Sequence, residues 1–188
     1  MSCTRGFPVS ERTSRGGILC LLLLAGIDTT WSAIGSSLWH LATHPEDQAR
    51  LRAEPDLIDS AVEELLRVYS PVTMAREVIA DVDVAGCPMK PGDKVLMSFP
   101  AANRDPAQFE NPDEFIIDRE RNRHVAFGSG IHRCLGSNLA RMELRVAIQE
   151  WLTRIPTFEL ADPAAVTWTG GQVRGPRTIP VRWSATQP

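Results

Sequence analysis

The sequence is poor in cysteine, and its cysteines follow no regular spacing. Among 188 residues there are four, and none of them forms a CxxC pair: Cys3, Cys20, Cys87 and Cys134. A zinc site or a secreted disulfide framework needs cysteines paired at short, repeated spacings. Both are therefore excluded, and a reducing, cytoplasmic setting fits best.

An excess of basic residues is also lacking. The formal net charge is -3, whereas proteins that bind the nucleic-acid backbone carry a clear positive excess. We therefore expect no nucleic-acid partner. The hydrophobic share of 43% and the charged share of 23% are those of an ordinary globular domain with a hydrophobic core.

No hydrophobic run is long enough, by itself, to indicate a membrane anchor. The longest, Ile18 to Ile27, has about half of the roughly 20 residues that a spanning helix needs, and the polar Asp28 follows it. Basic residues precede this run, as in a signal peptide, but no small-residue cleavage site follows. We expect a buried helix here and no membrane anchor.

The apolar patterning predicts four helices. A long central helix is expected over residues 17–41, a short one from Pro45 to about Ala53, a third over 57–69 and a last one over 136–154. The last helix has two apolar stripes, which predict deep packing: Leu139, Met142 and Val146 form one, and Leu144, Ile148, Leu152 and Ile155 the other.

Between and after these helices the pattern changes. Alternating apolar residues broken by glycine and proline predict short paired strands over residues 76–99, and residues 166–183 predict a final hairpin. Residues 100–124 have no period and predict a long meandering loop of the kind that usually serves a site. The fold class is mainly α with small β-sheets (α+β).

The strongest motif is the glycine-rich segment 127–136, FGSGIHRCLG. Cys134 precedes a predicted helix, where backbone N–H groups and the helix dipole favour the thiolate, a good metal ligand. Gly128, Gly130 and Gly136 permit close approach of the backbone to a flat cofactor, and Phe127 would supply an apolar wall. Taken alone, a buried structural cysteine in a glycine turn is the commoner explanation.

Two other motifs carry charge or hydroxyls at informative places. Glu64 and Arg67 stand at i and i+3 on the third predicted helix, where they can pair, although such pairs are common on solvated helices. Asp28 and Thr29 lie in mid-helix after Gly26, where threonine competes for backbone carbonyls and can open a kink. A pair that caps a helix break is an equal alternative.

Together these motifs resemble the cytochrome P450 family. The spacing Phe127-Gly128-x-Gly130-x-His132-x-Cys134-x-Gly136 is similar, position for position, to the family's haem-binding loop. The resemblance implies haem b (iron protoporphyrin IX) with Cys134 as the iron ligand and His132 bound to a haem propionate. It implies that Arg76 pairs with a propionate, that Glu64 and Arg67 lock onto the meander around 111–119, and that Asp28 and Thr29 deliver protons to dioxygen.

The resemblance also implies a reaction and its partners. A haem-thiolate monooxygenase inserts one oxygen atom of O2 into a small apolar substrate, using electrons from NAD(P)H through a reductase and a ferredoxin or flavodoxin. The substrate pocket is expected to lie between two segments, Val72, Thr73 and Met74 on one side and 170–173 on the other. Docking of the acidic electron donor is expected at the arginines near the cysteine, which are Arg121, Arg123, Arg133 and Arg141.

The resemblance extends from about Gly17 to Trp183, which is only the second, haem-binding half of the family's pattern. Residues 1–16 do not fit it, and we expect them to be atypical or disordered. Without a front half, the apolar stretch from Ile18 to Ile27 and the edges of the haem would be exposed. Two alternatives to an active monooxygenase portion therefore remain, a truncated haem-binding or electron-transfer module and an inactive fragment.

Overall fold

The structure, a computed structural model, describes residues 11–183 of the chain, with side chains from residue 16. Five α-helices carry the fold: α1 (Glu11–Thr43), α2 (Pro45–Ala53), α3 (Ile58–Val68), α4 (Phe99–Ala102) and α5 (Ser137–Arg154). Three 3-10 turns accompany them, η1 (Pro55–Leu57), η2 (Gly130–His132) and η3 (Pro163–Ala165). The expected class, mainly helical with small sheets, is confirmed.

The central helix is longer than its apolar pattern indicates. It begins at Glu11 instead of Gly17 and continues to Thr43, so residues 11–16, expected to be atypical or disordered, form its first turns. Residues 1–10 lie outside the described part of the chain. The other three expected helices start or end within one residue of α2, α3 and α5.

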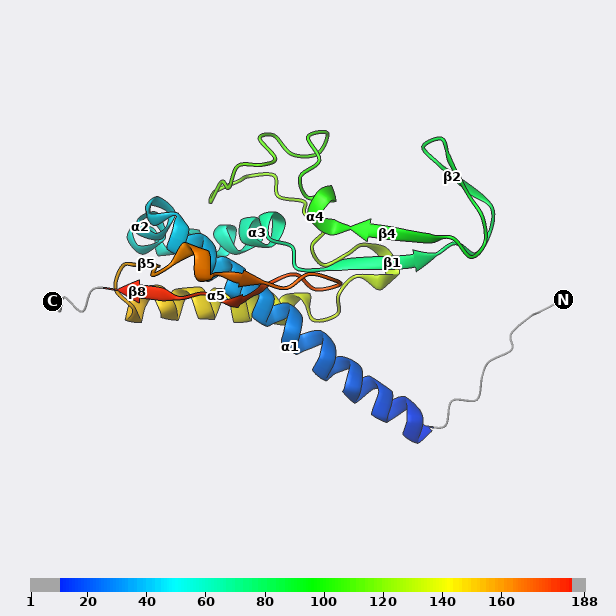
Figure 1. The fold of residues 1–188 in the computed structure, drawn as a ribbon, viewed down its shortest axis with the longest axis horizontal. Helices are drawn as coiled ribbons and strands as arrows, with labels where there is room; N and C mark the ends of the chain where they lie inside the picture. Colours follow the sequence, from blue (N-terminus) through cyan, green and yellow to red (C-terminus); the bar gives the residue numbers. More distant parts are fainter. Residues whose placement is uncertain (1–10, 184–188) are drawn as a thin grey trace.

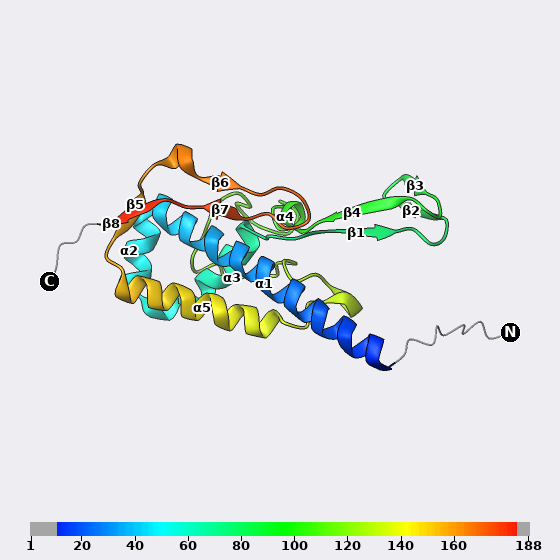
Figure 2. The same ribbon diagram turned by 60° about the horizontal axis from the view of Figure 1, so that its bottom comes forward.

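Burial of α1 differs between its two halves. The C-terminal half is packed, with Ser36, Ser37, His40 and Leu41 almost inaccessible to solvent. The expectation of a buried helix is wrong for residues 18–27, whose apolar side chains are exposed by up to 71% at Leu24. Figures 1 and 2 show the reason: this end of α1 projects beyond the other elements of the described chain. This exposure agrees with the expectation for residues 18–27 in a chain that carries only the second half of the family's pattern.

The apolar part of α1 is also longer than the ten residues from Ile18 to Ile27. The segment Gly16–Thr43 is long and apolar enough, by length and composition alone, to cross a membrane. The core helix of a water-soluble protein has the same length and composition, and the second half of this helix does pack into the core.

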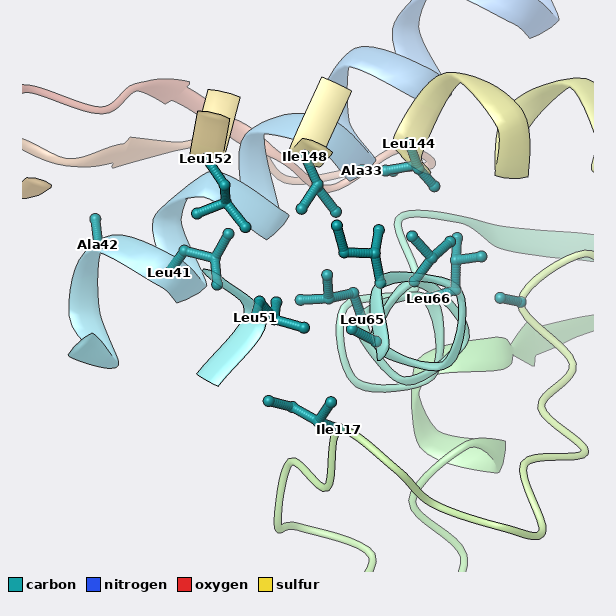
Figure 3. Close-up of a cluster of buried hydrophobic side chains, with 14 of the residues drawn as sticks. Ala33, Leu41, Ala42, Leu51, Leu65, Leu66, Ile117, Leu144, Ile148 and Leu152 are labelled. Carbon is teal, nitrogen blue, oxygen red and sulfur yellow. The ribbon is translucent and has the colours of Figure 1, made fainter. Parts of the chain in front are cut away.

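The hydrophobic core lies where α1, α2, α3 and α5 meet (Figure 3). Leu65 and Leu66 of α3 face Leu144 and Ile148 of α5, and Leu41 of α1 closes one side. All five side chains are at most 4% exposed, and burial of each contributes about 1.5–3 kcal/mol relative to exposure. This cluster fixes the position of the loop that precedes α5.

Eight short strands form four antiparallel pairs. β1 (Thr73–Glu77) pairs with β4 (Lys94–Ser98), and β2 (Val82–Val84) pairs with β3 (Cys87–Met89). In the tail, β6 (Thr167–Trp168) pairs with β7 (Pro176–Thr178), while β8 (Val181–Trp183) pairs with β5 (Phe158–Leu160). The expected final hairpin is thus β6–β7, and the chain then continues to a separate pairing with β5.

One of the two apolar stripes of α5 does not pack. Leu144, Ile148 and Leu152 are buried in the core, as expected, but Leu139, Met142 and Val146 are each about half exposed. Apolar stripes on two faces of a helix predict two neighbours, and within residues 11–183 only one face has them. The open stripe lies on the helix that follows the cysteine loop.

A buried histidine joins α1 to α2 and α3. His40 is inaccessible to solvent, and its Nε2 lies 2.8 Å from Asp47 Oδ2 while its Nδ1 lies 2.8 Å from the Tyr69 hydroxyl. With an ionised Asp47, Nε2–H donates to the carboxylate and Nδ1 accepts from the tyrosine. Burial and the neighbouring His44 lower the pKa of His40 to about 3.

This histidine predicts a loss of stability in mild acid. The pKa of His40 is about 6.5 in the unfolded chain and about 3 in the folded one, so only the unfolded chain takes up a proton as pH falls below 6.5. We expect the free energy of unfolding to be highest above pH 6.5 and to fall by up to about 1.4 kcal/mol per pH unit below it. Burial raises the pKa of Asp47, which acts in the opposite sense at lower pH.

Urea unfolding at pH 7 and pH 5 measures this effect. The steep dependence should disappear in His40→Gln and should persist in His132→Gln, which alters an exposed histidine. Equal pH dependence in the parent chain and in His40→Gln would contradict the assignment.

Candidate functional site

The cysteine loop is a tight glycine turn held by its own backbone. Gly128 and Gly130 have φ of 70° and 67°, in the left-handed region where a side chain is strained. The Cys134 amide donates to the Phe127 carbonyl at 2.9 Å, and the Arg133 amide donates to the Gly130 carbonyl at 3.1 Å. These bonds close the segment into a loop with the cysteine near its end, three residues before the first turn of α5.

This loop has the features that a flat, largely apolar cofactor requires. Cys134 is exposed and forms no disulfide within the described residues, and its neighbours Ile131 and Leu135 are 97% and 94% exposed. A Cβ added to Gly136 would lie 3.9 Å from the Cys134 sulfur, an ordinary van der Waals contact, so position 136 is directly beside the ligand atom. The Cys134 sulfur is flanked by exposed apolar side chains. It therefore fits the expected haem as its iron ligand.

The Glu64–Arg67 pair is wholly buried. Both side chains are inaccessible, and Arg67 Nε and Nη2 donate to the two carboxylate oxygens at 2.8 and 2.7 Å. The remaining donors of Arg67 reach the carbonyls of Asn103, Pro112 and Glu114 at 2.7–2.9 Å. All five N–H groups of the guanidinium are therefore used, and the pair is locked onto the meander as the motif implies.

A second arginine completes this cluster. Arg119 Nε donates to both Glu64 oxygens at 3.0 and 3.1 Å, and the Ile116 amide and the Asn122 side chain each add a bond at 3.0 Å. Burial by itself would raise the pKa of Glu64, but the bonds from Arg67, Ile116 and Arg119 outweigh it and lower that pKa. Glu64 is thus a buried anion shared between two cations.

Asp28 and Thr29 lie where the exposed half of α1 meets the packed half. The Thr29 hydroxyl donates to the Ala25 carbonyl at 2.7 Å, the competition for backbone carbonyls that threonine predicts. The helix nevertheless continues through this segment without a break. Asp28 is half exposed and lies 3.9 Å from the Arg177 guanidinium. Its carboxylate is therefore in contact with water.

The two segments expected to flank a substrate pocket lie side by side. Val72 forms a bridge with Val173, the Thr73 amide donates to the Gln172 carbonyl at 3.0 Å, and Gln172 Nε2 lies 3.4 Å from Met74 Sδ. Residues 72–74 and 172–173 are therefore joined directly to each other by hydrogen bonds. The two expected propionate partners, Arg76 and His132, are both exposed, and Arg76 Nη1 donates only to the adjacent Ala75 carbonyl among the described residues.

The arginines expected to dock an electron donor fall into two groups. Arg121, Arg123 and Arg133 are exposed and available. Arg141 is not, because its Nη2 donates to Glu63 Oε2 at 3.0 Å and its guanidinium lies over the Phe127 ring, 4.6 Å from the ring centroid. Since Arg141 is paired within the chain, we exclude it from the docking surface.

Sequence reasoning missed several members of the site. Glu63 also binds His124, with 3.0 Å between Glu63 Oε2 and His124 Nε2, and Asn103 Oδ1 accepts the Val125 amide at 2.7 Å. These partners lie 22 to 78 residues apart in the chain, so no helical or strand period reveals them. The only available signal was the position of Glu63 beside Glu64.

Comparison with known proteins agrees with the motifs. The family model described as Cytochrome P450 matches residues 18–163. Cytochrome P450 105C1 of Streptomyces sp is 48% identical over 170 residues, which cover 88% of this chain and 45% of that protein. The chain spans about half the length of the curated relatives it matches.

Solved structures give the same result. The cytochrome P450 PksS of Bacillus subtilis 168 is 41% identical with a TM-score of 0.87, covering 94% of this chain and 46% of that one. P450BioI, solved in complex with an acyl carrier protein ligated to hexadec-9Z-enoic acid, is 43% identical with a TM-score of 0.82, covering 87% and 43%. On the family model, the sequence identity and the fold together, the chain belongs to the cytochrome P450 family.

Proposed function

We propose that this chain is the haem-thiolate portion of a cytoplasmic monooxygenase that acts on a small apolar organic substrate. One observation carries the proposal: the exposed sulfur of Cys134 stands on a glycine turn between exposed apolar side chains, at the start of α5. When bound, haem b supplies the iron that activates dioxygen, and thiolate ligation raises its electron density and favours O–O cleavage.

The chain's own residues would bind, orient and supply protons. His132 and Arg76 are exposed cationic or hydrogen-bonding side chains suited to the two propionates. Half-exposed Asp28 would pass protons from water to the Thr29 hydroxyl oxygen, whose own O–H donates to the Ala25 carbonyl. The balanced reaction consumes one substrate molecule with its C–H bond, one O2, two electrons and two protons, and yields one hydroxylated product and one water.

Electrons would come from NAD(P)H through a reductase and an acidic ferredoxin or flavodoxin. Arg121, Arg123 and Arg133 are exposed near the cysteine loop, and a cluster of one charge sign favours encounter with a partner of the other sign. The acyl ligand of P450BioI shows that a relative of this chain accepts a long apolar chain. We propose an apolar substrate here on the same grounds.

The second candidate is a haem-binding or electron-transfer module without oxygenase activity. The exposed apolar side chains of α1 and α5 favour it, because substrate oxygenation requires a site closed to water, and these faces are open in the described chain. A third alternative is a chain that binds no haem. An in-frame coding sequence for a front half upstream of Met1 would favour the first candidate over the other two.

Turnover with isotopically labelled dioxygen separates these functions. The haem-loaded chain is given a surrogate ferredoxin with its reductase and NADPH, and a panel of apolar substrates. In a parallel reaction driven by peroxide, the isotopic label is carried by the peroxide, because the inserted oxygen atom then comes from it. One labelled oxygen atom in the product supports the monooxygenase. A thiolate-type spectrum without labelled product supports the haem-binding module, and the absence of any haem spectrum supports the third alternative.

Asp28→Asn tests the proton-delivery role. Loss of a positioned proton donor is expected to lower kcat by about a hundredfold or more, with little change in substrate KM. Arg177→Gln is the matched control, since it removes the weak 3.9 Å contact to Asp28 and leaves the carboxylate in place. Equal rates for Asp28→Asn and the control would contradict the role.

A further inference from the structure

Glu63, Arg141 and His124 form a cluster that the motifs do not account for. Glu63 of α3 accepts hydrogen bonds from Arg141 of α5 at both carboxylate oxygens, with 3.0 Å between Nη2 and Oε2. His124, in the segment that leads into the cysteine loop, lies 3.0 Å from the same carboxylate. The cluster therefore ties two core helices to the chain just before Phe127.

The histidine in this cluster has a defined tautomer. The Ala126 amide donates to His124 Nδ1 at 3.2 Å, so Nδ1 carries no proton, and Nε2–H donates to Glu63. The His124 side chain is only 2% exposed. Burial alone would raise the pKa of Glu63, but the bonds from His124 and Arg141 outweigh it and lower that pKa to about 2. The carboxylate is therefore ionised at any physiological pH.

Phe127 connects the cluster to Cys134, because it contacts Arg141 through its ring and Cys134 through its backbone carbonyl. The Arg141 guanidinium lies over the Phe127 ring at 4.6 Å, a cation–π contact held in place by the bidentate bond to Glu63. The Phe127 carbonyl in turn accepts the Cys134 amide at 2.9 Å. A movement of Phe127 would thus change the position of the backbone that carries the sulfur.

We propose that Glu63 and Arg141 are positioning residues for the cysteine ligand. They hold the Phe127 ring from the side of α3 and α5, and so fix the hydrogen bond that closes the Cys134 loop. The proposal rests on the haem-ligand role of Cys134, but the rigidity that it predicts belongs to the protein alone. It can therefore be measured without haem.

Amide hydrogen exchange at single-residue resolution in the haem-free chain tests the proposal. Arg141→Met should speed exchange of the Cys134 amide by about tenfold, because a partly buried cation–π contact to Phe127 is lost, while the Leu144 and Ile148 amides stay unchanged. Arg141→Lys, which keeps a cation over the ring, should restore most of the protection. Arg145→Met is the control, since Arg145 lies one turn further along α5 and makes only an exposed 3.8 Å contact with Asp59.

Unchanged exchange at Cys134 in Arg141→Met, or an equal increase in Arg145→Met, overturns the proposal. If Arg141→Met also exposes the core amides, the ratio of the Cys134 rate to the Ile148 rate decides. Arg141→Met should raise that ratio in the parent background. It should not raise it in a Phe127→Leu background, where Arg141 has no aromatic ring to contact. A rise of the same size in both backgrounds overturns the proposal. A failure to bind haem bears only on the proposed function.

Discussion

Arg67→Met is expected to remove a large part of the stability of the fold. The substitution leaves the inaccessible Glu64 carboxylate with one arginine in place of two, and it takes the donors from the carbonyls of Asn103, Pro112 and Glu114. Breaking a buried ion pair on one side costs about 3–5 kcal/mol, against a total of about 5–15 kcal/mol for a typical domain. Urea unfolding followed by circular dichroism measures the loss.

Arg154→Met is the matched control for this measurement. Arg154 pairs with Glu150 within one helix, α5, as Arg67 pairs with Glu64 within α3. Both side chains of the Arg154 pair are exposed, however, so the expected loss is about 0–1 kcal/mol. Equal losses in the two variants would show that the Glu64 cluster does not hold the meander against α3.

Cys134→Ala is expected to abolish stable haem binding without unfolding the protein. The side chain is exposed and takes no part in the core, so the free energy of unfolding should change by less than about 0.5 kcal/mol. The cofactor, however, would lose its only thiolate on this loop. Haem retained after gel filtration, measured by its absorbance per protein, should fall to background.

Cys87→Ala serves as the control for that variant. Cys87 is likewise an exposed free thiol, but it lies in β3, away from the glycine turn. Haem retention equal to that of the parent chain is expected. Loss of haem in this variant as well, or retention in Cys134→Ala, would contradict ligation by Cys134.

Local sequence patterns predicted the parts of this fold that local interactions determine. The i,i+3 spacing of Glu64 and Arg67 lies within one helix, and proline and glycine delimit α2 and the cysteine turn, so these features were found close to their observed bounds. The family resemblance, not a local pattern, implied that Glu64 and Arg67 bind the meander. This is confirmed, because Arg67 donates to carbonyls of that segment.

What the sequence could not show are contacts between segments far apart in the chain. Asn122 reaches Glu64 across 58 residues, and Arg141 reaches Glu63 across 78. Charged residues in loops and on helix surfaces are usually solvated, so nothing in their spacing marks them as partners. Arg141 was assigned to a docking surface for this reason, whereas the fold pairs it internally.

Burial was the other source of error. Hydrophobicity shows that a face of a helix prefers a partner, not whether the partner is present in the same stretch of chain. Leu24 of α1 and Met142 of α5 are exposed in residues 11–183, although each belongs to an apolar stretch or stripe of its helix. Met142 lies in the first half of α5, the helix that follows the cysteine loop.

The most direct test of the central claim is the reduced carbon monoxide spectrum of the haem-loaded 188-residue chain. If the sulfur of Cys134 holds the haem iron, the complex should show the strongly red-shifted Soret band of thiolate ligation, and Cys134→Ala should lack it. A Soret band at the position typical of histidine ligation in the parent chain, or an unchanged red-shifted band in Cys134→Ala, would contradict the account.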